Sequence, residues 1–122
     1  MTQELFRIVP NIYSDDPAKS KEFYIDFLGM ELVMDMEWIL TFASKTNATS
    51  QISLLQNDKK ERVNNDAVFL SIEVSDVDAM YKEAQKHNLT ITYALTNEPW
   101  GVRRFFVKDP NGATLNLLSH IA

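Results

Sequence analysis

The stretch SDDPAKSKEFYIDFLGM, residues 14–30, contains the start, the packed face and the end of one helix. Ser14-Asp15-Asp16 offers side chains that cap a helix, and Pro17 suits the first turn because its missing N–H leaves no bond unmade. Gly29 is typical of a left-handed helix end. The side chains spaced along one helical face are Ser20, Phe23, Tyr24, Phe27 and Leu28. The stretch therefore predicts a helix over about residues 17–28.

Short apolar runs separated by polar residues lie on both sides of this helix and read as strands. They are expected at residues 5–13, 31–34, 38–43 and 51–55. Pro10 limits the first strand to a position where no N–H is needed by a neighbouring strand. The first part of the chain thus predicts the order β-α-β-β-β.

The polar segment 57–66 has no apolar periodicity and is expected to be a linker. After it, a β-rich run over 67–74 leads into Ser75-Asp76-Val77-Asp78, which is typical of a helix start, and His87-Asn88 ends that helix. Asp109-Pro110-Asn111-Gly112 suits a type I turn. The later strands are expected at 90–95, 102–107 and 113–118. The sequence predicts an α+β fold of two βαβββ modules, one at about residues 1–56 and the other at about 67–122.

Length and composition restrict the class of protein. A chain of 122 residues is expected to form a single domain with its own core. The absence of cysteine excludes thiol chemistry and disulfides, and the net charge of -5 makes nucleic acid a poor partner. No apolar run approaches the ~20 residues that cross a bilayer, and no signal peptide is evident. We expect a cytoplasmic protein with no membrane partner.

Three motifs resemble one family of proteins. Phe23–Met30 (FYIDFLGM) resembles the helix end of the glyoxalase/bleomycin resistance/dioxygenase superfamily, also called vicinal oxygen chelate proteins. Val74–Asp78 resembles the start of its second helix, and Asp109–Gly112 resembles its final turn. The resemblance implies paired βαβββ modules that form curved mixed sheets around a ligand cleft, usually in a homodimer.

The same resemblance locates the metal ligands that enzymes of the superfamily carry on the first and last strand of each module. Counting from the motifs places these positions near Val9, Ser53, Phe69 and Asn116. Within two residues of each there is no His, Asp or Glu, and the candidate ligands are the amides of Gln51 and Asn116. Neutral amides bind divalent metals weakly without charged companions. His87 and His120 are expected to have structural or surface roles, so we expect neither a metal nor another cofactor.

The resemblance is strongest to the metal-free bleomycin resistance proteins, which sequester a drug. Their corner motif is similar to Pro99-Trp100-Gly101, followed here by Arg103, Phe105 and Asp109-Pro110. An indole at such a corner can stack on a planar ligand, and Arg103 or Arg104 can pair with an anionic group or stack. The alternative is that Trp100 only closes the end of the sheet.

Alternation along the expected strands adds further candidates. Trp38 and Phe42 are four residues apart and are expected to share one face, and Phe69 shares a face with Ser71. Aromatic side chains with a few polar groups suit a drug-sized ligand, although Trp38 and Phe42 also suit a core. The candidate ligand-binding residues are Trp38, Phe42, Gln51, Ser53, Phe69, Ser71, Trp100, Arg103 and Asn116. None is expected to be catalytic or to bind metal.

Three classes of function stay open. The first is metal-independent sequestration of a small aromatic or cationic molecule, as in antibiotic resistance, and the acidic charge agrees with a cationic ligand. The alternative is a glyoxalase-like lyase or isomerase, or a dioxygenase, with a non-standard metal site or with side-chain chemistry alone. The side chains for that chemistry would be Tyr13, Tyr93, Glu73 and Glu98. The third class is a module that binds another protein through an exposed sheet face.

Overall fold

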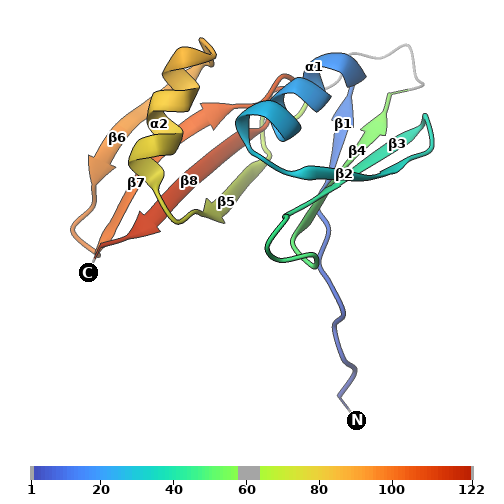
Figure 1. Cartoon of the computed structure of the whole chain (residues 1–122), viewed down its shortest axis with the longest axis horizontal. Helices are drawn as coiled ribbons and strands as arrows, with labels where there is room; N and C mark the ends of the chain where they lie inside the picture. The colour runs from blue at the N-terminus through green and yellow to red at the C-terminus, as the bar shows by residue number, and fades with distance from the viewer. Residues whose placement is uncertain (1, 58–63, 122) are drawn as a thin grey trace. The chain divides into compact units, whose positions relative to one another are not determined.

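The computed structural model describes residues 2–57 and 64–121. The chain divides into two compact units, Met1–Val63 and Asn64–Ala122, and each contains one helical segment and a four-stranded mixed sheet (Figure 1). The predicted α+β class and the two βαβββ modules are confirmed. Most of the expected linker, 57–66, lies outside the described residues.

The first unit follows the predicted order of elements. They are β1 (Asn11–Ser14), α1 (Pro17–Lys21), η1 (Glu22–Phe27), β2 (Glu31–Asp35), β3 (Ile39–Ala43) and β4 (Gln51–Gln56). The sheet order is β1-β4-β3-β2, with β1 parallel to β4 and the other neighbours antiparallel. A parallel first and last strand with the hairpin beside them is the arrangement that a βαβββ module requires.

The helical segment of this unit differs from the expected α-helix over 17–28. It is α-helical only for Pro17–Lys21, where the backbone N–H of Lys19 donates to Asp16 Oδ1 at 3.1 Å. The segment η1 is a π-helix, which Leu28 ends by donating its N–H to the carbonyl of Phe23 at 2.9 Å. The wider turns still bury the predicted aromatic face, since the rings of Phe23, Tyr24 and Phe27 are all buried.

The first strand is shorter than expected, and the prediction of a strand over 5–13 is wrong for most of that range. Only Asn11–Ser14 forms β1, preceded by an isolated parallel bridge between Ile8 and Ser50. The carbonyl of Pro10 accepts a hydrogen bond from the Ser53 N–H at 2.9 Å. Three apolar side chains before it are 75–81% exposed and pack on no core: Leu5, Phe6 and Ile8. An apolar run alone does not make a strand where no neighbour covers it.

The second unit has a longer helix and longer strands. They are β5 (Phe69–Glu73), α2 (Val77–Lys86), β6 (Ile91–Asn97), β7 (Val102–Lys108) and β8 (Thr114–His120), with sheet order β5-β8-β7-β6. Asp76 of the predicted helix start caps α2, because its Oδ1 accepts from the Ala79 N–H at 3.0 Å. No helix within the described ranges is long and apolar enough to cross a membrane.

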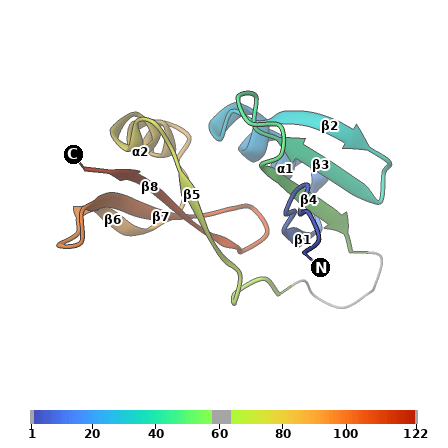
Figure 2. The same cartoon turned by 90° about the horizontal axis from the view of Figure 1, so that it is seen from below.

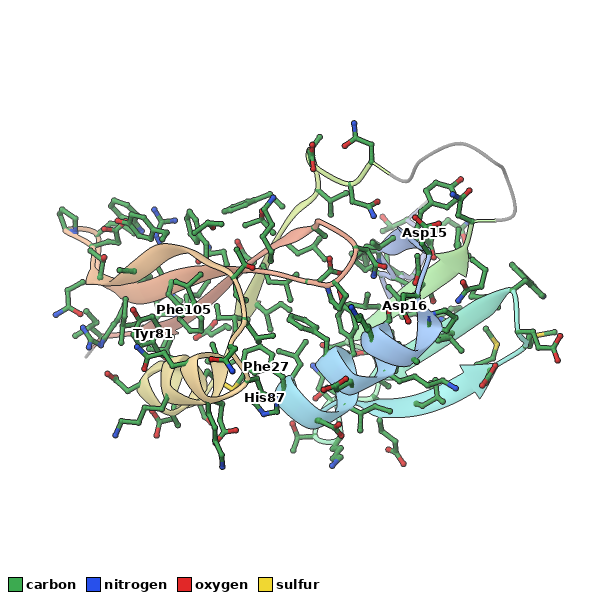
Figure 3. The ribbon with its side chains drawn as sticks, turned by 90° about the horizontal axis from the view of Figure 1, so that it is seen from above. Asp15, Asp16, Phe27, Tyr81, His87 and Phe105 are labelled. Carbon is green, nitrogen blue, oxygen red and sulfur yellow. The ribbon has the colours of Figure 1, made fainter. Side chains whose placement is uncertain are left out.

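The helix α2 lies over one face of its sheet, which gives the sheet two distinct sides (Figure 2). Tyr81 of α2 meets the ring of Phe105 edge-on at 5.0 Å between centroids, and both side chains lie between helix and sheet in Figure 3. The core beneath α2 is fully buried and includes Phe105, Val107, Leu115 and Leu117. Residues that alternate with these point away from α2.

The predicted turn between β7 and β8 is present and is held by one carboxylate. Asp109 Oδ1 accepts hydrogen bonds from the N–H groups of Asn111 and Ala113, both at 2.9 Å. Gly112 has a φ of 93°, which a residue with a side chain adopts only under strain. This turn fixes the register in which β7 and β8 present their side chains.

Candidate ligand-binding site

Strand register gathers aromatic and polar side chains on the face of the second sheet that points away from α2. Asn116 of β8 lies opposite Ser71 of β5 and Phe106 of β7, and Phe106 lies opposite Tyr93 of β6. We call this side the aromatic face and define it by Phe69, Ser71, Tyr93, Trp100, Arg104, Phe106 and Asn116. It draws on all four strands of the sheet and on the turn between β6 and β7.

The rings of this face form a continuous apolar surface. Phe69 meets Phe106 edge-on with centroids 5.1 Å apart, and Tyr93 lies on the other side of Phe106 at 4.7 Å. Phe69 is 51% exposed, although it sits in a strand among packed neighbours. An exposed ring set against the half-buried rings of Phe106 and Tyr93 offers area that a flat apolar molecule can cover.

Arg104 is the arginine of this face. Its Nη2 lies 2.7 Å from Glu98 Oε2, and its guanidinium carbon is 5.1 Å from the ring centroid of Trp100. The Tyr93 hydroxyl donates to the other oxygen of Glu98, Oε1, at 3.0 Å. Trp100 itself is 64% exposed, so its indole is supported by the guanidinium and remains accessible.

Arg103 lies on the opposite side of the sheet, which corrects the expectation that it lines the ligand site. Its Nη2 donates to Asp78 Oδ1 of α2 at 2.9 Å, and its Nη1 donates to Asn97 Oδ1 at 2.9 Å. The reason is alternation: Arg103 shares its side of β7 with the buried Phe105, so it faces α2. Arg103 therefore ties helix to sheet.

This contact gives a prediction about the ionisation of Asp78. The hydrogen bond from Arg103 lowers the pKa of the Asp78 carboxyl below its ordinary value of 3.8. Because folding lowers the pKa of Asp78, its contact with Arg103 stabilises the protein at pH values above the pKa of Asp78 in the unfolded chain. This stabilisation is lost as the pH falls through the pKa of Asp78 in the folded protein. An NMR titration of the Asp78 carboxyl carbon is expected to give a pKa below 3.8. In Arg103→Gln it should rise toward that value, and an unchanged pKa would contradict the assignment.

Asn116 is the most buried polar residue of the aromatic face, at 5% exposed. Its Nδ2 donates to the Ser71 hydroxyl at 3.0 Å. Its Oδ1 is buried and has no hydrogen-bond partner among the residues that the structure describes. A buried acceptor without a donor costs about 1–3 kcal/mol, which a donor on a ligand would recover.

The candidates of the first unit do not form a comparable cluster. Phe42 is fully buried and stacks on Tyr24 of η1 at 5.3 Å, which corrects the expectation that it contacts a ligand. Trp38 precedes β3 in a turn where Glu37 has a φ of 69°, and it is 59% exposed, so the two do not share a strand face as expected. The Ser53 hydroxyl is buried against that of Thr41 at 2.7 Å.

Gln51, the remaining candidate, lies at the start of β4 and is already bonded on both sides. Its Oε1 accepts from Arg7 Nη1, and its Nε2 donates to the carbonyl of Ala48 at 2.9 Å. These contacts hold the segment before β1 and the turn before β4. A structural role explains the amide without a ligand.

The residues at the metal positions of the superfamily do not fit a divalent ion. Register pairs Ser53 with Asn11 and Asn116 with Ser71, so the positions on the first strands are two residues from Val9 and Phe69. All four paired residues are neutral hydroxyls or amides, whereas such sites are built from imidazole, thiolate or carboxylate. Within 2–57 and 64–121, no three His, Asp or Glu side chains gather to hold a metal.

Both histidines pair with carboxylates. His120 Nδ1 lies 2.8 Å from Glu73 Oε2, and His87 Nε2 lies 3.4 Å from Glu83 Oε2 one helical turn earlier. The His120 and Glu73 side chains are 65% and 61% exposed, so water screens their interaction. His87 ends α2, where a polar or cationic side chain suits the helix dipole.

A comparison with protein families now identifies the fold. Residues 5–117 match the model of the Glyoxalase/Bleomycin resistance protein/Dioxygenase superfamily. The chain belongs to this superfamily. The match spans both units, and the two mixed sheets with their single helical segments are the vicinal oxygen chelate fold. Among curated proteins, no relative matches the chain.

Solved structures, one of them a member of the superfamily, resemble the chain over nearly its whole length. A member from Sphaerobacter thermophilus DSM 20745 is 23% identical with a TM-score of 0.79, covering 96% of this chain and 98% of that one. TnmS3, an antibiotic binding protein from Streptomyces sp. CB03234, is 24% identical with a TM-score of 0.76 and 98% coverage of both chains. TioX from Micromonospora sp. ML1 is 17% identical with a TM-score of 0.77, covering 94% of this chain and 98% of that one. At these identities the likeness shows the fold.

Proposed function

We propose that this protein sequesters a small aromatic or cationic molecule on the aromatic face of its second unit, without a metal and without chemistry on the ligand. The observation that carries the proposal is the exposed indole of Trp100, held over Arg104 beside the rings of Phe106 and Phe69. Binding sites for small molecules combine apolar rings with a few placed polar groups. The antibiotic binding reported for TnmS3 supports this class of function.

The binding residues that we propose are Phe69, Ser71, Trp100 and Asn116, with Arg104 in place of Arg103. Trp38 is exposed and stays a candidate of its own. The buried Phe42 and Ser53 are assigned to the interior, and Gln51 to the turn before β4. Asn116 would supply the polar anchor of the site, since its Oδ1 is the buried acceptor described above.

The same proposal covers the number of domains, the oligomeric state, the cellular location and the cellular role. We propose that the two units act as one domain, that the protein is a homodimer in the cytoplasm and that its role is antibiotic resistance. The family match over residues 5–117 supports a single domain, because it runs through both units. Apolar side chains that are more than half exposed in one copy support association, among them Leu5, Phe6 and Ile8.

An enzyme of the superfamily is the second candidate. The imidazole of His120 and the carboxylate of Glu73 are within 2.8 Å and exposed, so this pair could move a proton to or from a substrate. Tyr93 and Glu98 are also adjacent, but Arg104 already holds that carboxylate. Turnover of a substrate that is lost on adding a chelator would favour a lyase, isomerase or dioxygenase over sequestration.

Thermal unfolding of metal-analysed protein tests the proposal. The panel would contain bleomycin-type and other cationic or aromatic antibiotics, and separately Ni, Zn, Mn and Fe(II). A ligand that binds only the folded state adds about 2.7 kcal/mol of stability at a hundredfold excess over its Kd. We expect stabilisation by a drug in protein free of metal. Stabilisation by a metal, with no stabilisation by any drug, would contradict the proposal. Recovery of one specific protein in a pull-down would favour a protein-binding module.

A further inference from the structure

The charge of Arg104 is already matched within the aromatic face. Its Nη2 and Nε both approach Glu98 Oε2, at 2.7 and 3.0 Å. The two side chains are only 22% and 9% exposed, so the pair is largely withdrawn from water. An anionic ligand would have to displace or crowd Glu98 to reach the guanidinium, and like charges in close contact are unfavourable.

The guanidinium also lies among three rings. Its carbon is 5.5 Å from the centroid of Tyr93, 5.1 Å from that of Trp100 and 4.9 Å from that of Phe106. Distances below about 6 Å are those of cation–π contacts. A guanidinium that is paired with a carboxylate and lies among rings serves as a fixed support for those rings.

The corner that carries Trp100 is fixed at its base by the same carboxylate residue. The backbone N–H of Glu98 donates to the carbonyl of Val102 at 2.7 Å, and the N–H of Gly101 donates to the carbonyl of Glu98 at 3.1 Å. The Tyr93 hydroxyl occupies Glu98 Oε1 at 3.0 Å. Glu98 therefore locks both the backbone of the turn and the guanidinium beneath the indole.

From these contacts we infer that Arg104 is a positioning residue which holds the Trp100 indole in place, and that the ligand of the aromatic face is a planar aromatic molecule without negative charge. The inference rests on the proposed function for its ligand. It assigns recognition to stacking on Trp100 and Phe69 and removes anion binding from the roles of Arg104. The net charge of -5 acts in the same direction, because it repels anions at long range.

Three ring probes of one shape test the ligand class: the aminoacridine cation, neutral hydroxymethylanthracene and the anthracenecarboxylate anion, each substituted at the central ring. We expect the wild-type protein to bind the cation and the neutral probe at least about fivefold more tightly than the anion. Glu98→Gln removes the carboxylate that neutralises Arg104, so it is expected to reduce the difference in affinity between the anion and the other two probes. Preferential binding of the anion by the wild type would overturn the inference and leave small-molecule binding intact. Failure of all three probes would overturn the ligand class and count against the proposed function.

The positioning role has a readout that needs no ligand. The chain has two tryptophans, so Trp38→Phe makes Trp100 the sole source of indole fluorescence. Arg104→Gln is expected to lower the residual anisotropy of Trp100, because the indole loses its support. Arg104→Lys keeps the charge and loses the planar stack, so it should do the same if Arg104→Gln fails to fold. The control is Arg103→Gln, which lies toward α2 and should leave the anisotropy unchanged. Unchanged anisotropy in both Arg104 variants would overturn the positioning role.

Discussion

Replacing Phe42 by alanine is expected to lower the free energy of unfolding by about 3–5 kcal/mol, the range found for large aromatic truncations in a core. Phe42 is fully buried in β3, and its ring stacks on Tyr24 at 5.3 Å. Removing it leaves a cavity between the sheet and η1 that a π-helix segment with its own fixed hydrogen bonds cannot close. Denaturant unfolding followed by circular dichroism measures the change.

Trp38→Ala is the matched control, because it removes a larger ring from a residue that is 59% exposed. Its effect on stability is expected to stay within about 1 kcal/mol, since little packing is lost at the surface. Comparable losses in both variants would show that the two rings share one core. A Phe42→Ala variant that is stable but no longer binds the ligand would show that Phe42 belongs to the binding site.

The contrast between these two residues shows where alternation along a sequence stops being informative. Trp38 and Phe42 are four apart and share a face only if the strand is continuous between them. Glu37 has a φ of 69°, and the strand begins at Ile39, so Trp38 belongs to the turn. The residues MDMEW mark that turn only through Asp35, whose Oδ1 accepts a hydrogen bond from the Glu37 N–H at 3.1 Å, because they contain neither glycine nor proline.

A second ambiguity lies in β7, because alternation along its sequence VRRFFV places the same three residue types on both faces of the strand. Either face would carry one arginine, one phenylalanine and one valine, so alternation predicts a strand but not which arginine faces the ligand. Packing decides it: Phe105 and Val107 are fully buried under α2, which places Arg103 with them and Arg104 on the other side. The motif resemblance predicts a site at the Trp100 corner, and the structure places Arg104 rather than Arg103 beside that indole.

Features that depend on local chemistry were predictable from the sequence. Proline after Asp16 marks the first helix start, and Asp109 with Gly112 marks the final turn, because each requirement is met within a few residues. The π-helix and the brief first strand were not predictable, since both depend on what packs against them. The joining of Tyr93 and Glu98 with Arg104 likewise requires the pairing of β6 with β7.

Replacing Trp100 by alanine is expected to weaken ligand binding by about 2 kcal/mol, roughly thirtyfold in Kd, as for an aromatic residue at the centre of a binding surface. The indole is 64% exposed and lies over the Arg104 guanidinium, so its outer area is available to a ligand. Stability should fall little, because a residue with this exposure loses few packing contacts. Isothermal titration with a drug that stabilises the wild-type protein gives the change in Kd.

The variant Trp100→Phe tests in the same experiment whether a smaller aromatic ring keeps part of the affinity for the ligand. A phenyl ring retains part of the stacking area, so its loss of affinity should lie between those of the wild type and Trp100→Ala. If Trp100→Ala unfolds instead, the indole closes the end of the sheet and the aromatic face is structural. If it folds and binds with unchanged affinity, the ligand lies elsewhere, and exposed Trp38 becomes the residue to replace next. Weakened binding with an intact fold would leave the turn between β6 and β7 as the part of the molecule that recognises the ligand.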